Sequence, residues 1–215
     1  MSEPSAISLR AKRNSSITVC AKLLKEKQVD AMVTPGHTGA TVAATKVLVR
    51  TLPGIDRPAL AASLPAQEGR FILMDAGANP DCTPVNLAQF AIMGEIYAQY
   101  LFKLDRPRVG LLSVGGEDIK GCELTKESFK LMDQLPINFV GNVESSHIFS
   151  GKVADVIVCD GFTGNVILKM AEGLYRINNA LGGNNNKFWE AMNYEHVGGT
   201  PVLGVGAPVI IGHGC

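Results

Sequence analysis

Two segments of the chain, residues 29–47 and 153–170, show the same order of features. Each begins with an apolar run rich in β-branched residues, continues through a loop spelled Gly-x-Thr-Gly, and ends in a helical pattern. An apolar run of strand length followed directly by a helix predicts a strand–loop–helix unit. Such a unit constrains both the fold and the place where a ligand can bind, because the strand end and the helix start meet at the loop.

Strand-like and helix-like patterns alternate along the rest of the chain. Further strands are predicted at "ALAASL", "RFILMDAG", "RVGLLSVG" and "INFVGNV", and helices at residues 38–49, "VNLAQFAIMGEIYAQYLF", "ELTKESFKLMDQL" and residues 163–181. Apolar strands separated by helices predict an α/β fold with a doubly wound, largely parallel sheet. Ligands bind beyond the carboxyl ends of the strands in such sheets, so both Gly-x-Thr-Gly loops are expected at that edge.

Composition narrows the classes of function. The 215 residues suit one domain with a real core, here predicted as a single α/β domain over residues 1–215, or two small lobes. The 20 basic residues balance 20 acidic ones, unlike the basic surface of a nucleic-acid-binding protein. The apolar runs are too short to span a membrane, and no signal peptide precedes the first basic cluster. Five cysteines without a Cys-x-x-Cys pair favour free thiols over disulfides or zinc ligands. We therefore expect a cytoplasmic protein without a metal or cofactor.

A helix that starts in a glycine-rich loop is a candidate anion site. Its first amides lack intrahelical acceptors and lie at the positive end of the helix dipole, so they can bind phosphate or an oxyanion. The same pattern also suits a turn in which Thr only caps the helix and Gly only fits the bend. No Walker A or Gly-x-Gly-x-x-Gly motif occurs. The candidate phosphate or oxyanion ligands are Gly36, His37, Thr38, Gly39, Gly161, Gly164 and Asn165, with Arg13, Ser15 and Ser16 at a further helix start.

Two more glycine-rich loops follow predicted strands. In "LLSVGGEDIKGCELTKE", Lys120 would place a positive charge where it neutralises a phosphate or a thioester oxyanion, although surface lysines are usually only solvated. In "LMDAGANPDC", the acidic residues would either orient the site or form the turn. The supporting residues expected in or near the site are Asp75, Asn79, Glu117, Asp118 and His213.

Taken in order, several strings resemble the bacterial phosphate acyltransferases of phospholipid synthesis, the PlsX family. They are "KRNSSI", "PGHTGAT", "GIDRPALAASLP", "DAGANPD", "AIMGEIYAQ", "RVGLLSVGGEDIKGCELTK", "INFVGNVE", "ADVIVCDGFTGNVILK", "GGTPVLGV" and "APVIIGHG". The resemblance implies a fold similar to that of isocitrate and isopropylmalate dehydrogenases, with no nicotinamide needed.

The resemblance also implies a reaction, in which inorganic phosphate attacks the thioester of a long-chain acyl group on acyl carrier protein. The products are an acyl phosphate and the free carrier. Lys120, Asp160 and Thr163 would be the catalytic residues, with the two helix starts holding phosphate or the carbonyl oxygen. The family implies a cytoplasmic homodimer, peripheral at the membrane in full-length relatives, which passes acyl phosphate to a membrane acyltransferase.

The chain departs from the family pattern in several places. The family's opening glycine-rich segment and closing helix are not found, and a "GGNNNK" turn stands where a helical hairpin is expected. His37 and Gly116 stand where Asn and Thr are expected. These departures predict a truncated member and leave open an inactive form that binds phosphate or the carrier protein. A phosphotransacetylase or a dehydrogenase is a further alternative on fold grounds alone.

Overall fold

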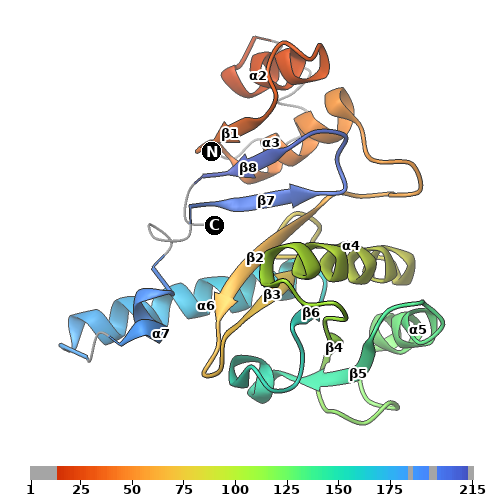
Figure 1. Ribbon diagram of the computed structural model, residues 1–215, viewed down its shortest axis with the longest axis vertical. Coiled ribbons are helices and arrows are strands. Elements are labelled where there is room, and N and C mark those ends of the chain that lie inside the picture. Colours follow the sequence, from red (N-terminus) through yellow and green to blue (C-terminus); the bar gives the residue numbers. More distant parts are fainter. Residues whose placement is uncertain (1–13, 184–185, 194–197, 213–215) are drawn as a thin grey trace.

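The strands form one eight-stranded sheet with helices on both faces (Figure 1). The computed structural model describes residues 14–183, 186–193 and 198–212. The elements are α2 (Ser16–Lys25), β1 (Met32–Thr34), α3 (Thr38–Ala44), η1 (Thr45–Val49), β2 (Ala59–Pro65), β3 (Arg70–Met74), α4 (Pro84–Phe102), β4 (Val109–Ser113), α5 (Glu123–Met132), β5 (Phe139–Glu144), η2 (Ser145–Ser150), β6 (Val156–Val158), α6 (Gly161–Ala180), α7 (Lys187–Glu190), β7 (Thr200–Leu203) and β8 (Val209–Ile211).

Two parallel blocks make up most of the sheet. The strand order is β1-β8-β7-β2-β3-β6-β4-β5. Strands β3, β6, β4 and β5 are parallel to one another, and β1 is parallel to β8. Three antiparallel pairings, β8 with β7, β7 with β2 and β2 with β3, join the blocks. The predicted α/β class and mostly parallel sheet are confirmed.

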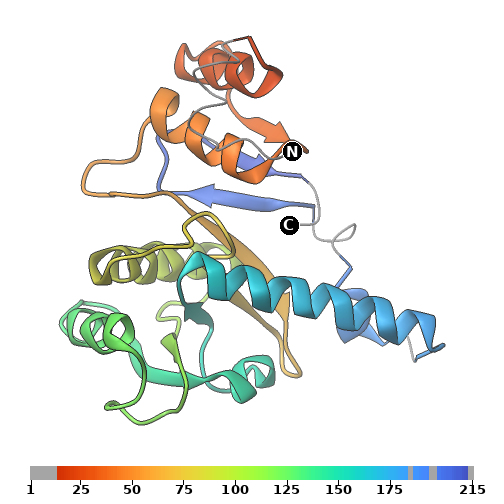
Figure 2. The same ribbon diagram turned by 180° about the vertical axis from the view of Figure 1, so that it is seen from behind.

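Each face of the sheet carries its own hydrophobic core. On one face, buried residues of α2, α3 and α6 pack against the strands, as with Leu24 and Leu168. On the other face, α4 and α5 contribute residues such as Phe90 and Met132. Figure 1 shows α4 in front of the sheet, and Figure 2, from behind, shows α3 and α6 in front instead. The helices on two faces are what a doubly wound sheet requires.

Local sequence explains where the long helix α4 begins and ends. Thr83 is its N-cap, Pro84 follows in the first turn, and the Thr83 and Asn86 side chains bond to each other's backbone amides in a capping box. Lys103 ends the helix in the left-handed conformation. The helix thereby leads the chain from β3 to β4 across one face.

The expectation that both Gly-x-Thr-Gly loops share one edge is wrong. The sheet reverses direction three times between β1 and β6, so these two strands end at opposite edges. They also stand five positions apart in the strand order, roughly 24 Å at about 4.8 Å per strand. The sequence pattern could not reveal this, because the antiparallel strands β2, β7 and β8 determine the relative direction of the two blocks.

Candidate functional site

Four strand ends meet at one edge of the sheet. Met74 in β3 pairs with Val158 in β6, Leu111 in β4 pairs with the same Val158, and Ser113 pairs with Glu144 in β5. The loops that follow β3, β6, β4 and β5 therefore leave side by side. They contain, in that order, Asp75 with Asn79, Asp160, Lys120 and the turn η2. Three of the predicted loops are thus brought together.

The chain leaves this edge in opposite directions from neighbouring strands. The loop after β6 enters α6 on one face, whereas the loops after β3 and β4 lead to α4 and α5 on the other. Adjacent parallel strands whose connections diverge in this way open a crevice at their carboxyl ends, the usual ligand site of such sheets. We call this place the switch-point edge.

The buried carboxylate of Asp75 organises the loop after β3. Its oxygens accept hydrogen bonds from the backbone amides of Leu60, Gly77, Ala78 and Asn79 and from Asn79 Nδ2, at 2.7–3.2 Å. Asn79 Nδ2 also donates to the Pro58 carbonyl at 2.8 Å. Burial raises the pKa of Asp75, and these hydrogen bonds act against the rise. Asp75 and Asn79 therefore hold the loop in shape from inside.

Most backbone amides at the start of α6 donate hydrogen bonds to acceptors within the protein. Asp160 is the N-cap: its carboxylate accepts from the Thr163 amide at 2.8 Å and the Thr163 hydroxyl at 2.7 Å. The Gly161 amide donates to the Asn79 carbonyl at 2.8 Å. Among the described residues, the amide of Phe162 has no hydrogen-bond acceptor. The capping residue is thus Asp160, three positions before the threonine expected to cap.

Close packing explains the two glycines of this helix start. A Cβ atom on Gly161 would lie 2.7 Å from the backbone N and O of Asn79, and one on Gly164 would lie 2.9 Å from the carbonyl carbon of Asp75. Asn165 packs over Gly77 of the same loop. Because the two glycines have no side chains, α6 packs directly on the loop after β3. The glycines therefore serve contact between two protein segments.

Lys120 lies on the exposed loop between β4 and α5. Its amide donates to the Glu117 carbonyl at 3.0 Å, and the Glu117 side chain and the Lys120 methylenes flank Gly115. Glu117 and Asp118 are exposed, and Asp118 lies beside Gly141 of β5. Lys120 is the single lysine or arginine in the loops that follow β3, β4 and β6.

The other predicted anion ligands form a separate group near β1. His37, not Thr38, caps α3: its Nδ1 accepts from the Ala40 amide at 3.3 Å. Ser15 caps α2, and Ser16 begins that helix, so both lie at a helix start as predicted. Gly36 lies against Ile17 of α2, so the two helix starts adjoin. Gly39 sits in the first turn of α3, and Arg13 and His213 lie outside the described residues.

Arg57 is a neighbour of the switch-point edge that the sequence patterns did not single out. Because β2 is antiparallel to β3, residues before β2 lie beside the carboxyl end of β3. Arg57 donates to the Asp81 carbonyl at 2.8 Å, and its charge acts on Cys82 in the same loop. Recognition of the β2–β3 hairpin would have been the signal that places this second cation here.

Two thiols at this edge are poorly suited to nucleophilic attack. Burial, together with the negative charge of Asp75, raises the pKa of Cys82 to about 11. Cys159 is buried, and burial followed by the charges of Asp160 and Asp75 raises its pKa well above the ordinary value. A thiol that stays protonated at neutral pH is a weak nucleophile. Neither thiol is therefore a good candidate nucleophile at neutral pH.

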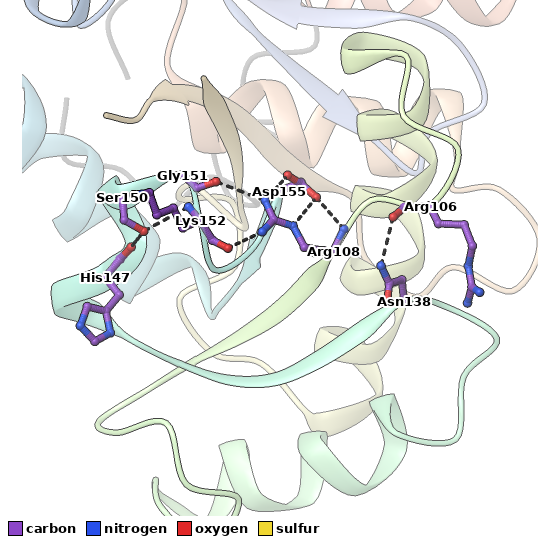
Figure 3. Close-up of polar contacts among 8 residues, drawn as sticks. All are labelled: Arg106, Arg108, Asn138, His147, Ser150, Gly151, Lys152 and Asp155. Carbon is purple, nitrogen blue, oxygen red and sulfur yellow. Dashed lines mark hydrogen bonds and ion pairs between the residues drawn. The ribbon is translucent and has the colours of Figure 1, made fainter. Parts of the chain in front are cut away.

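The opposite edge carries a structural ion pair. The guanidinium of Arg108, just before β4, donates to both carboxylate oxygens of Asp155, just before β6, at 2.8 and 3.0 Å (Figure 3). It also donates to the carbonyls of Gly151 and Lys152. Burial of Asp155 works against its charge, but the bonds from Arg108 outweigh this and lower the pKa of Asp155. This pair clamps the amino ends of two site strands.

Within the described residues, no group of three or more His, Cys, Asp or Glu side chains is placed to hold a metal ion. No helix in the same part of the chain is long and apolar enough to cross a membrane.

Comparison with known proteins decides the family. A family model described as "Fatty acid synthesis protein" matches residues 1–215. A phosphate acyltransferase of Acidobacterium capsulatum is 47% identical, over all of this chain and 68% of the relative. One from Thermoanaerobacterium thermosaccharolyticum is 43% identical over 99% of this chain and 69% of the relative. The chain belongs to the phosphate acyltransferase family. The predicted family and acyltransferase class are confirmed.

Solved structures place the phosphate acyltransferase chain in a wider fold group. EutD phosphotransacetylase from Staphylococcus aureus has a TM-score of 0.61 at 21% identity, covering 93% of this chain and 62% of that protein. A phosphotransacetylase from Streptococcus pyogenes has a TM-score of 0.64 at 20% identity, covering 89% and 59%. A 4-hydroxythreonine-4-phosphate dehydrogenase from Klebsiella pneumoniae has a TM-score of 0.54 at 14% identity, covering 92% and 60%. These likenesses show the fold alone.

Proposed function

We propose that the chain transfers the acyl group of a long-chain acyl-[acyl carrier protein] to inorganic phosphate. The observation that carries this proposal is the switch-point edge, where Lys120 and the start of α6 leave neighbouring strands toward opposite faces. Membership in the phosphate acyltransferase family supplies the reaction class. The substrate assignment rests on the fit between this edge and the chemistry of the two reactants.

The reaction needs no nucleophilic side chain. An oxygen of hydrogen phosphate attacks the thioester carbonyl, the new C–O bond forms, and the C–S bond breaks. The proton of hydrogen phosphate ends on the departing sulfur, so the products are the acyl phosphate dianion and the free carrier thiol. The protein has to hold the two reactants together and stabilise the tetrahedral oxyanion between them.

Lys120 and Arg57 are the cations that would hold phosphate in this scheme. The α6 start cannot do so by its dipole alone, because the Asp160 carboxylate already occupies it and repels a second anion. The Phe162 amide remains as a donor for the developing oxyanion. Asp160 and Thr163 then act by positioning that amide, and Asp75 and Asn79 by fixing the loop on which α6 rests.

Exposed apolar side chains at the same edge suit an acyl substrate. Val114 and Ile119, on the loop after β4, and Phe162, in the first turn of α6, are 66–79% exposed. Large apolar side chains on glycine-rich loops beside a polar site offer contact to a hydrocarbon chain. These side chains would contact the acyl chain on the side away from the phosphate.

The decisive assay measures carrier thiol release from palmitoyl-[acyl carrier protein] with and without phosphate, and traps acyl phosphate with hydroxylamine. We expect phosphate-dependent release, and a loss of about 10²-fold for Lys120→Ala, because removing one charged group that stabilises the reacting anion in the transition state typically costs this much. Lys126→Ala, an exposed lysine on α5, is the matched control and should keep full rate. Equal rates for both variants would remove Lys120 from the site, and no release by a folded protein would contradict the function. Preference for a coenzyme A thioester would favour a phosphotransacetylase.

The homodimer, the cytoplasmic location and the membrane acyltransferase that consumes acyl phosphate stay predictions from the family. An apolar stripe on α6 supports self-association: Val166, Met170, Leu174, Ile177 and Leu181 are 40–81% exposed and recur at helical spacing. Sedimentation equilibrium tests the dimer, and a monomer at micromolar concentration would contradict it.

A further inference from the structure

A cavity of about 260 Å³ opens at the carboxyl end of β5, beside the loop that follows β4. Its polar lining comes from Asn142, Glu144 and His147, and its apolar lining from Val140, Val143 and Val153. Gly116 of the β4 loop borders it. None of these side chains was assigned a role from the sequence, and the cavity adjoins the switch-point edge.

A β-bulge turns Asn142 toward this cavity. Val109 of β4 pairs with Phe139, but Leu111 pairs with Asn142, so β5 contains one extra residue between the two pairs. Gly141 occupies the bulge with φ +83°, a conformation that favours glycine. Bulges commonly re-aim a side chain beside an active site. Here the bulge places a 9% exposed amide side chain on the wall of the cavity.

The amide of Asn142 is only half satisfied by the protein. Its Nδ2 donates to the Glu117 carbonyl at 2.8 Å, which fixes the orientation of the side chain. Its Oδ1 is buried and accepts no hydrogen bond from any described residue. Buried acceptors of this kind are rare in folded proteins. A residue of the cavity wall therefore keeps one hydrogen-bond acceptor that the protein does not use.

We propose that this cavity binds the pantetheine arm of the carrier-protein substrate, an inference that rests on the proposed function. Pantetheine carries amide N–H and hydroxyl donors, which suit Asn142 Oδ1 and the Glu144 carboxylate, and a dimethyl-substituted carbon, which suits the valine wall. The volume lies below the 300–1,000 Å³ of complete small-molecule pockets, so it fits a linear segment better than the nucleotide of coenzyme A.

The position of the cavity agrees with that occupant. β5 stands two positions from β6 in the sheet, roughly 10 Å away, and their carboxyl ends share the switch-point edge. An arm lying in the cavity passes Gly116 and enters the edge on the side of the Lys120 loop. The thioester at its end would then reach the cation proposed to hold phosphate.

Binding can be tested without turnover. In a ¹⁵N–¹H spectrum of the whole chain, titration with free pantetheine is expected to shift the Asn142 side-chain amide and the Gly116 backbone amide. Asn142→Ala should abolish the Gly116 shift. Asn138→Ala is the matched control, because Asn138 Nδ2 also donates to a backbone carbonyl, that of Arg106 at 3.0 Å, but at the far end of β5 (Figure 3). Shifts confined to other regions, or none at millimolar pantetheine, would overturn the proposal.

Kinetics with two thioesters give a second, independent test. An acyl-pantetheine presents the whole arm, whereas an acyl-N-acetylcysteamine lacks most of it. Asn142→Ala should lower kcat/KM about tenfold for the first, the value of roughly one hydrogen bond, and leave the second unchanged. Val140→Phe, which narrows the cavity and keeps the Asn142 side chain, should give the same pattern. An equal loss with both thioesters would mean that Asn142 only supports the Glu117 loop, and would refute the arm site.

The two proposals fail in different ways. A wild-type protein that releases no carrier but binds pantetheine at Gly116 would contradict the acyl transfer and keep the arm site. An active wild-type protein with no distinction between the thioesters would keep the acyl transfer and contradict the arm site.

Discussion

Alanine substitution at two glycines of α6 should change stability in opposite directions. At Gly164, a new Cβ would meet the Asp75 carbonyl group and lie 3.2 Å from the Ala76 Cα atom. These are backbone atoms, which cannot rotate away, so we expect an overpacking cost of about 1–3 kcal/mol even after the gain in helix propensity. At Gly173 nothing lies within 4 Å of the same position, so only the propensity gain of about 0.8–1 kcal/mol remains.

Thermal denaturation of the two variants checks this reasoning directly. For a chain of this length, 1 kcal/mol shifts Tm by about 2–4 °C. We therefore expect Gly173→Ala to raise Tm by a few degrees and Gly164→Ala to lower it by several, without added ligand. If Gly164→Ala matched Gly173→Ala, α6 would not rest on the β3 loop as described. The glycine would then more simply serve the approach of an anion.

Three further changes test other parts of the structure. Asp155→Asn should lower the free energy of unfolding at pH 7 by about 2 kcal/mol, since it removes a charge-assisted pair with Arg108. The pKa of Asp155 is lower in the folded protein than in the unfolded one, where it lies near 3.9, so this contribution to stability is complete above that pH and fades as the pH falls further. The denaturation midpoints of the wild type and of Asp155→Asn should therefore converge in acid. A difference between these midpoints that stays constant with pH would contradict the pair. Asn79→Ala removes the Nδ2 hydrogen bonds to Asp75 and Pro58 and should lower the free energy of unfolding, measured in urea, by about 2–3 kcal/mol. A loss below about 1 kcal/mol would contradict the role of these buried hydrogen bonds. His37→Ala removes the cap of α3 and should cost about 1 kcal/mol by the same measurement, with no effect expected if the cap does not form in solution.

Local patterns were sufficient to predict most elements of the fold. The apolar run before Asp160 and the periodicity after it predicted β6 and α6, although the helix begins at Gly161 rather than at Thr163. The helix start at Ser15 and Ser16 is confirmed, because capping depends on neighbours three residues away. Interactions between residues that are close in the sequence can be predicted from the sequence alone.

The pairing of strands that are distant in the sequence could not be predicted from local patterns. The antiparallel hairpin of β2 and β3 brings Arg57 to the loop after β3, where it contacts Asp81, and no local signal fixes the direction of one strand against another. The bulge at Gly141 was hidden for the same reason, since an extra residue in β5 is defined only against β4. Asn142 therefore looked like an ordinary strand residue until its partner strand was known.

The charges at the switch-point edge explain why the roles divide between loops. Two carboxylates accept hydrogen bonds from the protein itself: Asp75 holds the β3 loop, and Asp160 caps the start of α6. An anionic nucleophile brought next to them is repelled unless cations stand nearby. Those cations, Lys120 and Arg57, come from segments outside the carboxylate hub. Under the proposed function, the rigid part of the edge would place the oxyanion donor, and the exposed β4 loop would supply the charge that favours phosphate binding.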